Sequence, residues 1–406
     1  MEGTLIDGTV HIGADAKQRF HDARGYGRMH DDTTVELAPV EAAHLLARGD
    51  LDTITIDVSS HPDKTVPTDD TIAEANNTQP NASGTHLTDD PSTYDVGFRG
   101  FLVYTNTARQ FTVYKDLRDR GFYLSPARSS WPGVDPAVGD QIDFIVYPRG
   151  MGPYDNEVAH QIRVIGEREA VSMPTLGSAV LAVVDEDGEL TYFETNATPT
   201  FHELISHNPS DTETQDTDTT ETSYDSVTQD QSSLPTGLSV DMVHDRIVCY
   251  DATSSLYEEH FYGQRLFGRN ADTGPLQLSL IEAAYLAQQD VIATDTAAIV
   301  AIGRDVEGDR FDRRLRVYAA LRDRGTVPKS GFKFGADFRV YTAFDGIDSL
   351  DHSTDLIRVC QPDMRVYPRD LSLDIRLAGG VRKRMVFALT PANGDIHWLS
   401  VARLTL

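Results

Sequence analysis

The stretch Val317–Gly325 reads VYAALRDRG, and nearly the same letters occur earlier in the chain, because Val113–Gly121 reads VYKDLRDRG. Apolar residues recur at helical spacing in both stretches, and a glycine closes each one, as is common just past the end of a helix. The two stretches are therefore predicted to be equivalent helices. Their repetition indicates that the chain contains an internal duplication.

Further matched blocks extend this duplication in unchanged order. The pairs are Glu36–Leu46 with Gln277–Ala287, Asp143–Tyr147 with Asp337–Tyr341, Ile162–Val164 with Ile357–Val359, and Val180–Phe193 with Val386–Leu399. The first pair has the periodicity of an amphipathic helix, and the later pairs have that of strands. Leu371–Ala378 is predicted to be helical, and Asn393-Gly394 predicts a hairpin turn. We therefore expect an α/β (α+β) fold, in which each copy is a small helix-rich module followed by an α/β module with a mixed sheet.

Two segments rich in Thr, Asp, Asn and Ser interrupt the matched blocks. Such segments cannot bury enough apolar surface to fold by themselves, so both are predicted to be acidic linkers. The predicted organisation is an amino-terminal module at 1–58, a linker at 59–95, an α/β module at 96–198, a linker at 199–236, a second amino-terminal module at 237–300 and a second α/β module at 301–406.

The charge of the chain is strongly acidic, with 63 Asp and Glu against 36 Lys and Arg and a net charge of -27. Arginine replaces lysine almost everywhere, which is typical of proteins that work in molar salt, where screening weakens self-repulsion. An acidic protein with disordered acidic tails is the alternative, but it does not explain why lysine is also rare in the ordered segments. Half of the cations lie in residues 301–406, which suits a polyanionic partner.

No apolar run is long enough to cross a bilayer, and the first residues show no secretory signal, so a cytoplasmic protein without a membrane partner is expected. The two cysteines are too few for a disulfide framework or a cysteine zinc site. The histidines, including His11, His21, His30 and His44, show no paired metal spacing. We therefore expect no metal and no cofactor.

Comparing the two copies singles out three polar residues of the second copy, of which the first copy keeps one. The aligned pairs are Tyr341 with Tyr147, His352 with Glu157 and Lys383 with Gly177. Tyr, His and Lys suit RNA cleavage by the adjacent 2′-hydroxyl, which needs a base, an acid and a cation beside the phosphorane. In this interpretation Tyr341 is the base, His352 the acid and Lys383 the stabiliser. A tyrosine is a weak base near neutral pH, so Tyr341 is either assisted by cations or orients the 2′-hydroxyl.

The run Tyr318–Tyr341, YAALRDRGTVPKSGFKFGADFRVY, resembles the catalytic domain of the archaeal tRNA-splicing endonucleases, or tRNA-intron lyases. The resemblance continues through His352-Ser353 and Val381-Arg382-Lys383, and Leu278–Leu286 resembles the amino-terminal module of that family. The duplication resembles the haloarchaeal two-repeat type, in which one chain carries a degenerate and an active nuclease unit and two chains form a homodimer.

This resemblance implies a function and a set of site residues. The implied substrate is precursor tRNA folded into a bulge-helix-bulge, and no DNA substrate is expected. The implied products are a 2′,3′-cyclic phosphate and a 5′-hydroxyl, formed without a metal. The catalytic positions of the family fall on Tyr341, His352 and Lys383. Arg376 matches one arm of a pair that pinches a bulged base, and Trp398 stands at the other arm, where the family often has arginine. The acidic turn Asp185–Glu189 matches a loop that docks on a partner chain, or is a solvated hairpin turn.

Two other functions are consistent with parts of the sequence. A non-catalytic structural or RNA-binding subunit would have no reason to keep the tyrosine, histidine and lysine together. A metal-dependent nuclease would need clustered carboxylates. The convenient candidates are Asp337, Asp351 and Asp355, but Asp143 repeats Asp337 in the degenerate copy, which suggests a structural role for that pair.

Overall fold

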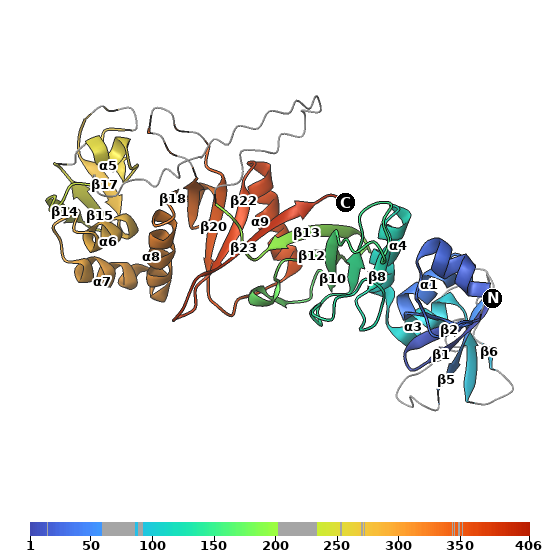
Figure 1. Cartoon of the computed structure of the whole chain (residues 1–406). Coiled ribbons are helices and arrows are strands. Elements are labelled where there is room, and N and C mark those ends of the chain that lie inside the picture. Colours follow the sequence, from blue (N-terminus) through green and yellow to red (C-terminus); the bar gives the residue numbers. More distant parts are fainter. Residues whose placement is uncertain are drawn as a thin grey trace, which may run out of the picture. The chain divides into compact units, whose positions relative to one another are not determined.

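The computed structural model describes the chain except for residues 14, 59–85, 88–91, 202–233, 252–253, 269–270, 272, 343, 345, 348–349 and 351. The chain forms two compact units (Figure 1). Unit 1 comprises Met1–Glu169, Ala179–Glu194 and Arg403–Leu406, and unit 2 comprises Ala170–Ser178 and Thr195–Ala402. Most of both predicted linkers lies outside the described residues, although two strands fall within 59–95: β6 (His86–Leu87) and β7 (Thr93–Val96).

The amino-terminal module of unit 1 is a sheet of strand order β3-β4-β2-β1-β5-β7-β6 covered by helices. Its other elements are β1 (Glu2–Ile6), β2 (Thr9–Ile12), η1 (Lys17–Asp22), β3 (Arg28–Met29), β4 (Val35–Leu37), α1 (Pro39–Ala47) and β5 (Thr53–Asp57). Helix α1 begins three residues later than the matched block because Glu36 belongs to β4 and Pro39 occupies the first helical turn. A proline suits that place because its missing N–H would have no helical partner there.

The α/β module of unit 1 places α4 against a sheet of order β13-β12-β10-β9-β8. Its elements are α3 (Phe98–Thr105), α4 (Ala108–Asp119), β8 (Leu124–Pro126), β9 (Phe144–Val146), β10 (His160–Gly166), β12 (Val180–Val184) and β13 (Leu190–Asn196). Strands β10 and β12 run parallel, with Ile162 opposite Val180, and the other pairs are antiparallel.

The amino-terminal module of unit 2 has a smaller sheet of order β14-β15-β17-β16. Its elements are β14 (Val240–Val243), β15 (Arg246–Cys249), α5 (Ser254–Glu258), β16 (Gln264–Arg265), β17 (Leu276–Ser279), α6 (Leu280–Gln288) and α7 (Thr296–Glu307). Helix α6 starts with a capping box, in which the Ser279 hydroxyl accepts from the Glu282 N–H and the Glu282 carboxylate accepts from the Ser279 N–H. Helices α6, α7 and α8 (Asp309–Arg322) pack side by side (Figure 1).

The α/β module of unit 2 repeats the strand order of its counterpart as β18-β19-β20-β22-β23. Strands β20 and β22 run parallel, with Ile357 opposite Val386, and α9 connects them and packs on β22 (Figure 1). A short pair, β11 with β21, precedes α9. The elements are β11 (Val171–Ser172), η2 (Met173–Thr175), β18 (Val327–Ser330), η4 (Phe332–Phe334), β19 (Phe338–Tyr341), β20 (Asp355–Cys360), β21 (Arg365–Val366), α9 (Pro368–Gly380), β22 (Arg384–Leu389) and β23 (His397–Leu404).

The α/β class predicted from the sequence is confirmed, and the matched blocks occupy equivalent elements in both copies. Each amino-terminal module also contains a sheet that the helical periodicity did not predict. Several of these strands, such as β3 and β16, are only two residues long, so they carry no readable alternation. Among the described residues, no helix has both the length and the apolar character needed to cross a membrane.

Candidate active site

Three chain segments of unit 2 meet at one end of its sheet. Val340 of β19 lies opposite Asp355 of β20, and Asp355 lies opposite Arg384 of β22. Neighbouring strands are about 4.8 Å apart, so these residues form one row across the sheet. Tyr341 follows Val340 directly, and Lys383 directly precedes Arg384. The sheet register therefore brings Tyr341 and Lys383 to the same end of the sheet, on either side of the segment that leads into β20. This end of the strands is called the sheet edge below.

His352 belongs to that entering segment, which is fixed by contacts on both sides. The Thr354 N–H donates to the carbonyl of Val340 at 2.9 Å. The Lys383 ammonium donates to the carbonyl of Ser353. Because the two residues after His352 are held in this way, its exposed imidazole is kept at the same end of the sheet as Tyr341 and Lys383.

Tyr341 is buried against the amino-terminal module of the same copy. Its ring meets the Phe261 ring edge to face, with 5.8 Å between centroids, and the Arg339 guanidinium lies 5.8 Å from the Tyr341 ring centroid. The Lys329 ammonium lies 4.8 Å from the Phe261 ring on the same side of the module. The position of Tyr341 therefore depends on the packing of both modules of the second copy, and one cation, Arg339, lies beside its ring.

Lys383 is a half-buried cation in a polar and aromatic environment. Its ammonium lies 5.6 Å from the centroid of the Phe334 ring. Burial lowers the pKa of Lys383, the charge of Arg339 lowers it further, and the charge of Asp355 opposes both. Asp355 is fully buried and forms an ion pair with the Arg384 guanidinium at 2.7 Å. Asp355 is therefore paired with Arg384, while the Lys383 ammonium contacts the Ser353 carbonyl.

The two predicted substrate-binding residues lie in different places. Arg376 is exposed on α9, seven residues before Lys383. Trp398 is only 9% exposed and packs edge to face on Phe201, with 5.0 Å between ring centroids. It lies opposite Ala388, which is about 13 Å along β22 from the row that contains Arg384. Within its own module, Trp398 is therefore not brought to the edge that holds Tyr341, His352 and Lys383.

The Asp337 carboxylate contacts the sheet backbone and two arginines, Arg310 and Arg314. One carboxylate oxygen accepts from the Val359 N–H at 2.8 Å, and the other accepts from Arg310 at 2.6 Å. The first copy repeats this arrangement, since Asp143 accepts from the Val164 N–H at 2.7 Å. The shared contact supports a structural role for this pair of aspartates.

Of the two remaining carboxylates considered for a metal-dependent mechanism, the structure describes one, Asp355. Asp355 is occupied by its ion pair with Arg384. Asp351 lies outside the described residues. The described carboxylates near the candidate site therefore serve protein contacts.

The first copy closes off the tyrosine that corresponds to Tyr341. The Tyr147 hydroxyl donates to the carbonyl of Pro132 at 3.0 Å, and a side chain at Gly133 would collide with that hydroxyl, since a Cβ there would lie 2.1 Å away. Pro132 and Gly133 belong to the 127–143 segment between β8 and β9, where the second copy has the much shorter 331–337 segment. The Tyr147 hydroxyl is therefore bonded within the protein, to Ser125 and Pro132, which gives Tyr147 a structural role.

The structure also gathers a group that the sequence did not predict, namely His11, His30 and Glu36 in the amino-terminal module of unit 1. These residues lie on three different strands or strand ends, so their spacing along the chain follows no metal-binding motif. The one available signal was the alternation of Arg28 and His30, which places two polar side chains on one face of an edge strand.

The fold and this site can be compared with known proteins. The sequence model described as tRNA intron endonuclease, catalytic C-terminal domain, matches residues 311–398. The model described as tRNA intron endonuclease, N-terminal domain, matches residues 1–60 and 239–297, which are the two amino-terminal modules.

Curated relatives named tRNA-splicing endonuclease are similar along the whole chain. A relative from Haloferax volcanii is 52% identical over 405 residues, which covers 100% of both chains. Relatives from Natronomonas pharaonis and Haloarcula marismortui are each 44% identical and likewise cover 100% of both chains. Full-length identity at this level, together with the matches of both domain models, establishes that the chain belongs to the tRNA-splicing endonuclease family and carries its catalytic domain in the second repeat.

Proposed function

We propose that this chain is a homodimeric endonuclease that cuts precursor tRNA at bulge-helix-bulge intron boundaries without a metal ion. The products are a 2′,3′-cyclic phosphate and a 5′-hydroxyl. The observation that carries the proposal is the convergence of the Tyr341, His352 and Lys383 segments at one edge of the unit 2 sheet. That edge belongs to the domain that matches the catalytic domain of the family.

Each of the three residues has a separate task in the proposed reaction. Tyr341 takes the proton of the 2′-hydroxyl, or orients that hydroxyl, as its oxygen attacks the adjacent phosphorus. His352 gives a proton to the leaving 5′-oxygen. Lys383 stabilises the additional negative charge of the phosphorane. Arg339 supports this arrangement because its positive charge lies beside both Tyr341 and Lys383.

Substrate binding and assembly are further parts of the proposal. Arg376, exposed on α9, is proposed to contact the bulged RNA. Trp398 is proposed as the opposite arm by resemblance. Because its ring is buried, the side chains around it would have to move before it could contact RNA. The turn between Asp185 and Glu189 is closed by the Asp185 N–H donating to the Glu189 carbonyl at 3.1 Å, with the acidic side chains largely exposed. Docking of this turn on a partner chain is proposed as one contact of the dimer.

The experiment that tests the proposed roles is single-turnover cleavage of a bulge-helix-bulge precursor by full-length variants in high salt. We expect His352→Ala and Lys383→Ala each to lower the rate by at least about 100-fold while precursor binding stays close to that of the unaltered protein. Tyr341→Phe removes only a hydroxyl and should also lower the rate without unfolding the module.

Tyr147→Phe is the matched control, because it removes the same hydroxyl from the closed site of the first copy. It should cleave at the unaltered rate under conditions where it is folded. Equal losses in the Tyr341→Phe and Tyr147→Phe variants would contradict the assignment of catalysis to the second copy. Full activity of His352→Ala would contradict the proposed acid.

A further inference from the structure

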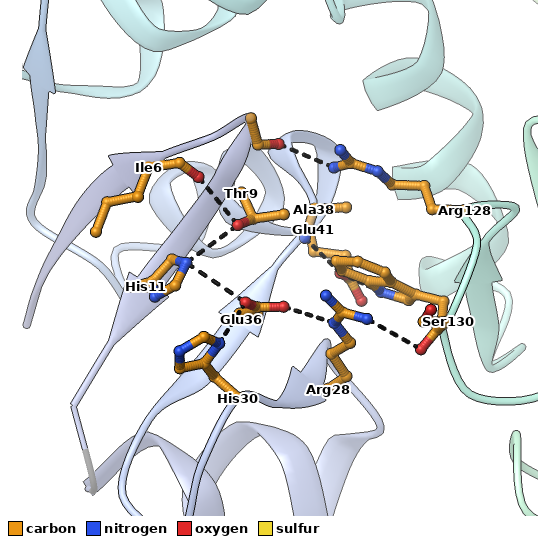
Figure 2. Close-up of polar contacts among 12 residues, drawn as sticks. Ile6, Thr9, His11, Arg28, His30, Glu36, Ala38, Glu41, Arg128 and Ser130 are labelled. Carbon is orange, nitrogen blue, oxygen red and sulfur yellow. Dashed lines mark hydrogen bonds and ion pairs between the residues drawn. The ribbon is translucent and has the colours of Figure 1, made fainter.

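The group formed by His11, His30 and Glu36 lies on one face of the sheet in the first amino-terminal module (Figure 2). In the register of β2 and β4, His11 lies directly opposite Glu36, and in the register of β3 and β4, Arg28 lies directly opposite Glu36. His30 follows Arg28 by two residues, so strand alternation brings it to the same face. Three neighbouring strands thus direct these side chains toward one point.

The distances between the possible ligand atoms are those of a metal site. The Oε1 atom of Glu36 lies 3.5 Å from Nε2 of His11 and 2.7 Å from Nδ1 of His30. All three atoms lie within 4.8 Å of one another. Ligand atoms that bind zinc at about 2.1 Å in a tetrahedral arrangement are about 3.4 Å apart, so small side-chain adjustments would accommodate an ion. Two imidazoles and one carboxylate are a common donor set for zinc and other first-row transition metals.

Neighbouring residues hold the Glu36 carboxylate and the His11 ring in place. Glu36 is buried, and its second oxygen accepts from the Arg28 guanidinium at 2.5 Å, which holds the carboxylate in place. The Thr9 hydroxyl lies 3.1 Å from Nε2 of His11 and can donate its proton to the carbonyl of Ile6, also at 3.1 Å. In that arrangement the Thr9 oxygen accepts the Nε2 proton of His11, so a metal ion bound at Nε2 would replace this hydrogen bond and release that proton. The contact of Arg28 with the second Glu36 oxygen is of the kind that fixes ligand geometry in metal sites.

The second repeat shows that the module folds without this group. Equivalent strands there bring Val248 and Gln264 opposite Gln277. Val248 and Gln277 stand where the first copy has His11 and Glu36. Gln264 and Leu266 stand where it has Arg28 and His30. The buried glutamate at the start of the following helix is kept in both copies, as Glu41 and Glu282. The histidines and Glu36 are therefore an addition to the first repeat rather than a requirement of the fold.

The group is also accessible to an ion from solvent. It lines a pocket of about 560 Å³ that also includes Arg128 and Trp131. The His30 side chain is 51% exposed, whereas the Glu36 side chain is 6% exposed. An ion could therefore reach the group from solvent beside His30 and bind to the buried carboxylate of Glu36.

We propose that His11, His30 and Glu36 bind one divalent transition-metal ion of the zinc class in the first repeat. The ion would join the short edge strand β3 to β4 and β2. Nitrogen ligands favour zinc, nickel or cobalt over magnesium and calcium, which prefer oxygen ligands. This site lies in the first repeat, whereas the proposed catalytic residues lie in the second, so the ion would stabilise the module and take no part in cleavage.

The test is metal binding by the full-length protein, treated with a chelator and transferred to metal-free, high-salt buffer at neutral pH. Co²⁺ serves as the probe because a site with few nitrogen and oxygen ligands gives a visible absorption band far stronger than that of hydrated Co²⁺. Excess Mg²⁺ is included to occupy the acidic surface. We expect one strong Co²⁺ site per chain, displaced by Zn²⁺ and not by Mg²⁺, and an unfolding temperature that rises with Zn²⁺.

His30→Ala is the informative variant, because this exposed side chain can be removed without opening a core. It should weaken Co²⁺ binding at least about tenfold and abolish the effect of Zn²⁺ on the unfolding temperature. His397→Ala, which removes an exposed histidine of unit 2, is the matched control and should bind like the unaltered protein. Binding that is unchanged in His30→Ala, or the absence of a Co²⁺ site that resists Mg²⁺, would overturn the proposal. Because the readout is binding, the result does not depend on the cleavage mechanism.

Discussion

Glu41 and Glu282 occupy the same place in the two copies, as the third residue of equivalent helices, but their neighbours differ. The Glu41 carboxyl accepts from the Gly27 N–H at 2.7 Å and from the Trp131 indole at 3.2 Å. Burial raises the pKa of Glu41 to about 7. At Glu282 burial acts in the same direction, but the Lys329 ammonium at 2.6 Å outweighs it and lowers the pKa.

The raised pKa of Glu41 predicts that stability falls as pH rises. The folded protein binds the Glu41 proton more tightly than the unfolded chain, so this contribution is complete below about pH 4.5 and is lost as pH rises toward about 7. The upper limit of the change is about 3 kcal/mol. Thermal unfolding at constant high salt between pH 5 and pH 8 measures it, and Glu41→Gln should flatten the dependence.

Glu282→Gln is the matched comparison, because it removes the charge that balances the largely buried Lys329. This variant should be less stable at every pH in the range, by roughly 3–5 kcal/mol, since a buried cation is left without a partner. An unchanged pH dependence in Glu41→Gln would show that another group is responsible.

The catalytic candidates could be named from the sequence because the two copies could be compared with each other. Tyr341, His352 and Lys383 lie on three separate segments, and the strand register then explains how they meet. The burial of Trp398 could not be predicted, because it depends on contacts with Phe201, far away in the sequence. His11 and Glu36 were missed for the same reason, since cross-strand neighbours have no fixed sequence spacing.

At the scale of secondary structure, helices were easier to predict than strands. Helices α4, α6 and α8 combine an apolar face with a clear end, such as Gly325 after α8, and their periodicity is readable. Helix α7 was not predicted, although it has an N-cap at Asp295 and ends at Gly308. The strands of the amino-terminal modules are short and depend on pairing with segments that are distant in the sequence. A pattern within a few neighbouring residues therefore does not predict them.

The segment between β8 and β9 is the element that most clearly separates the two copies. In the first copy it carries Trp131, whose buried ring packs under the Arg28 guanidinium, with 4.8 Å from the guanidinium carbon to the ring centroid. The same segment supplies the carbonyl that binds the Tyr147 hydroxyl. This one segment thus binds the Tyr147 hydroxyl and also lines the pocket beside His11 and His30.

For the whole molecule, the net charge of -27 has the largest consequence. The range of electrostatic repulsion is about 10 Å at 0.1 M salt and about 3 Å at 1 M, so dilute buffer exposes the folded chain to strong self-repulsion. The relatives from Haloferax, Natronomonas and Haloarcula are consistent with a protein adapted to high salt.

We therefore predict that the unfolding temperature rises steeply between 0.1 M and 2 M potassium chloride. Sucrose at matched water activity is the control, because it favours compact states without screening charge. A protein that is as stable in dilute buffer as in molar salt would show that the acidic residues are not an adaptation to salt.

We propose that the end of the unit 2 sheet that holds Tyr341, His352 and Lys383 cleaves RNA without a metal. The most direct measurement is cleavage of a bulge-helix-bulge precursor tRNA in high salt with an excess of chelator, followed by analysis of the new ends. We expect cleavage at both intron boundaries, with 2′,3′-cyclic phosphate and 5′-hydroxyl ends. Cleavage that appears only after a divalent metal is added, or that leaves 5′-phosphate ends, would contradict it.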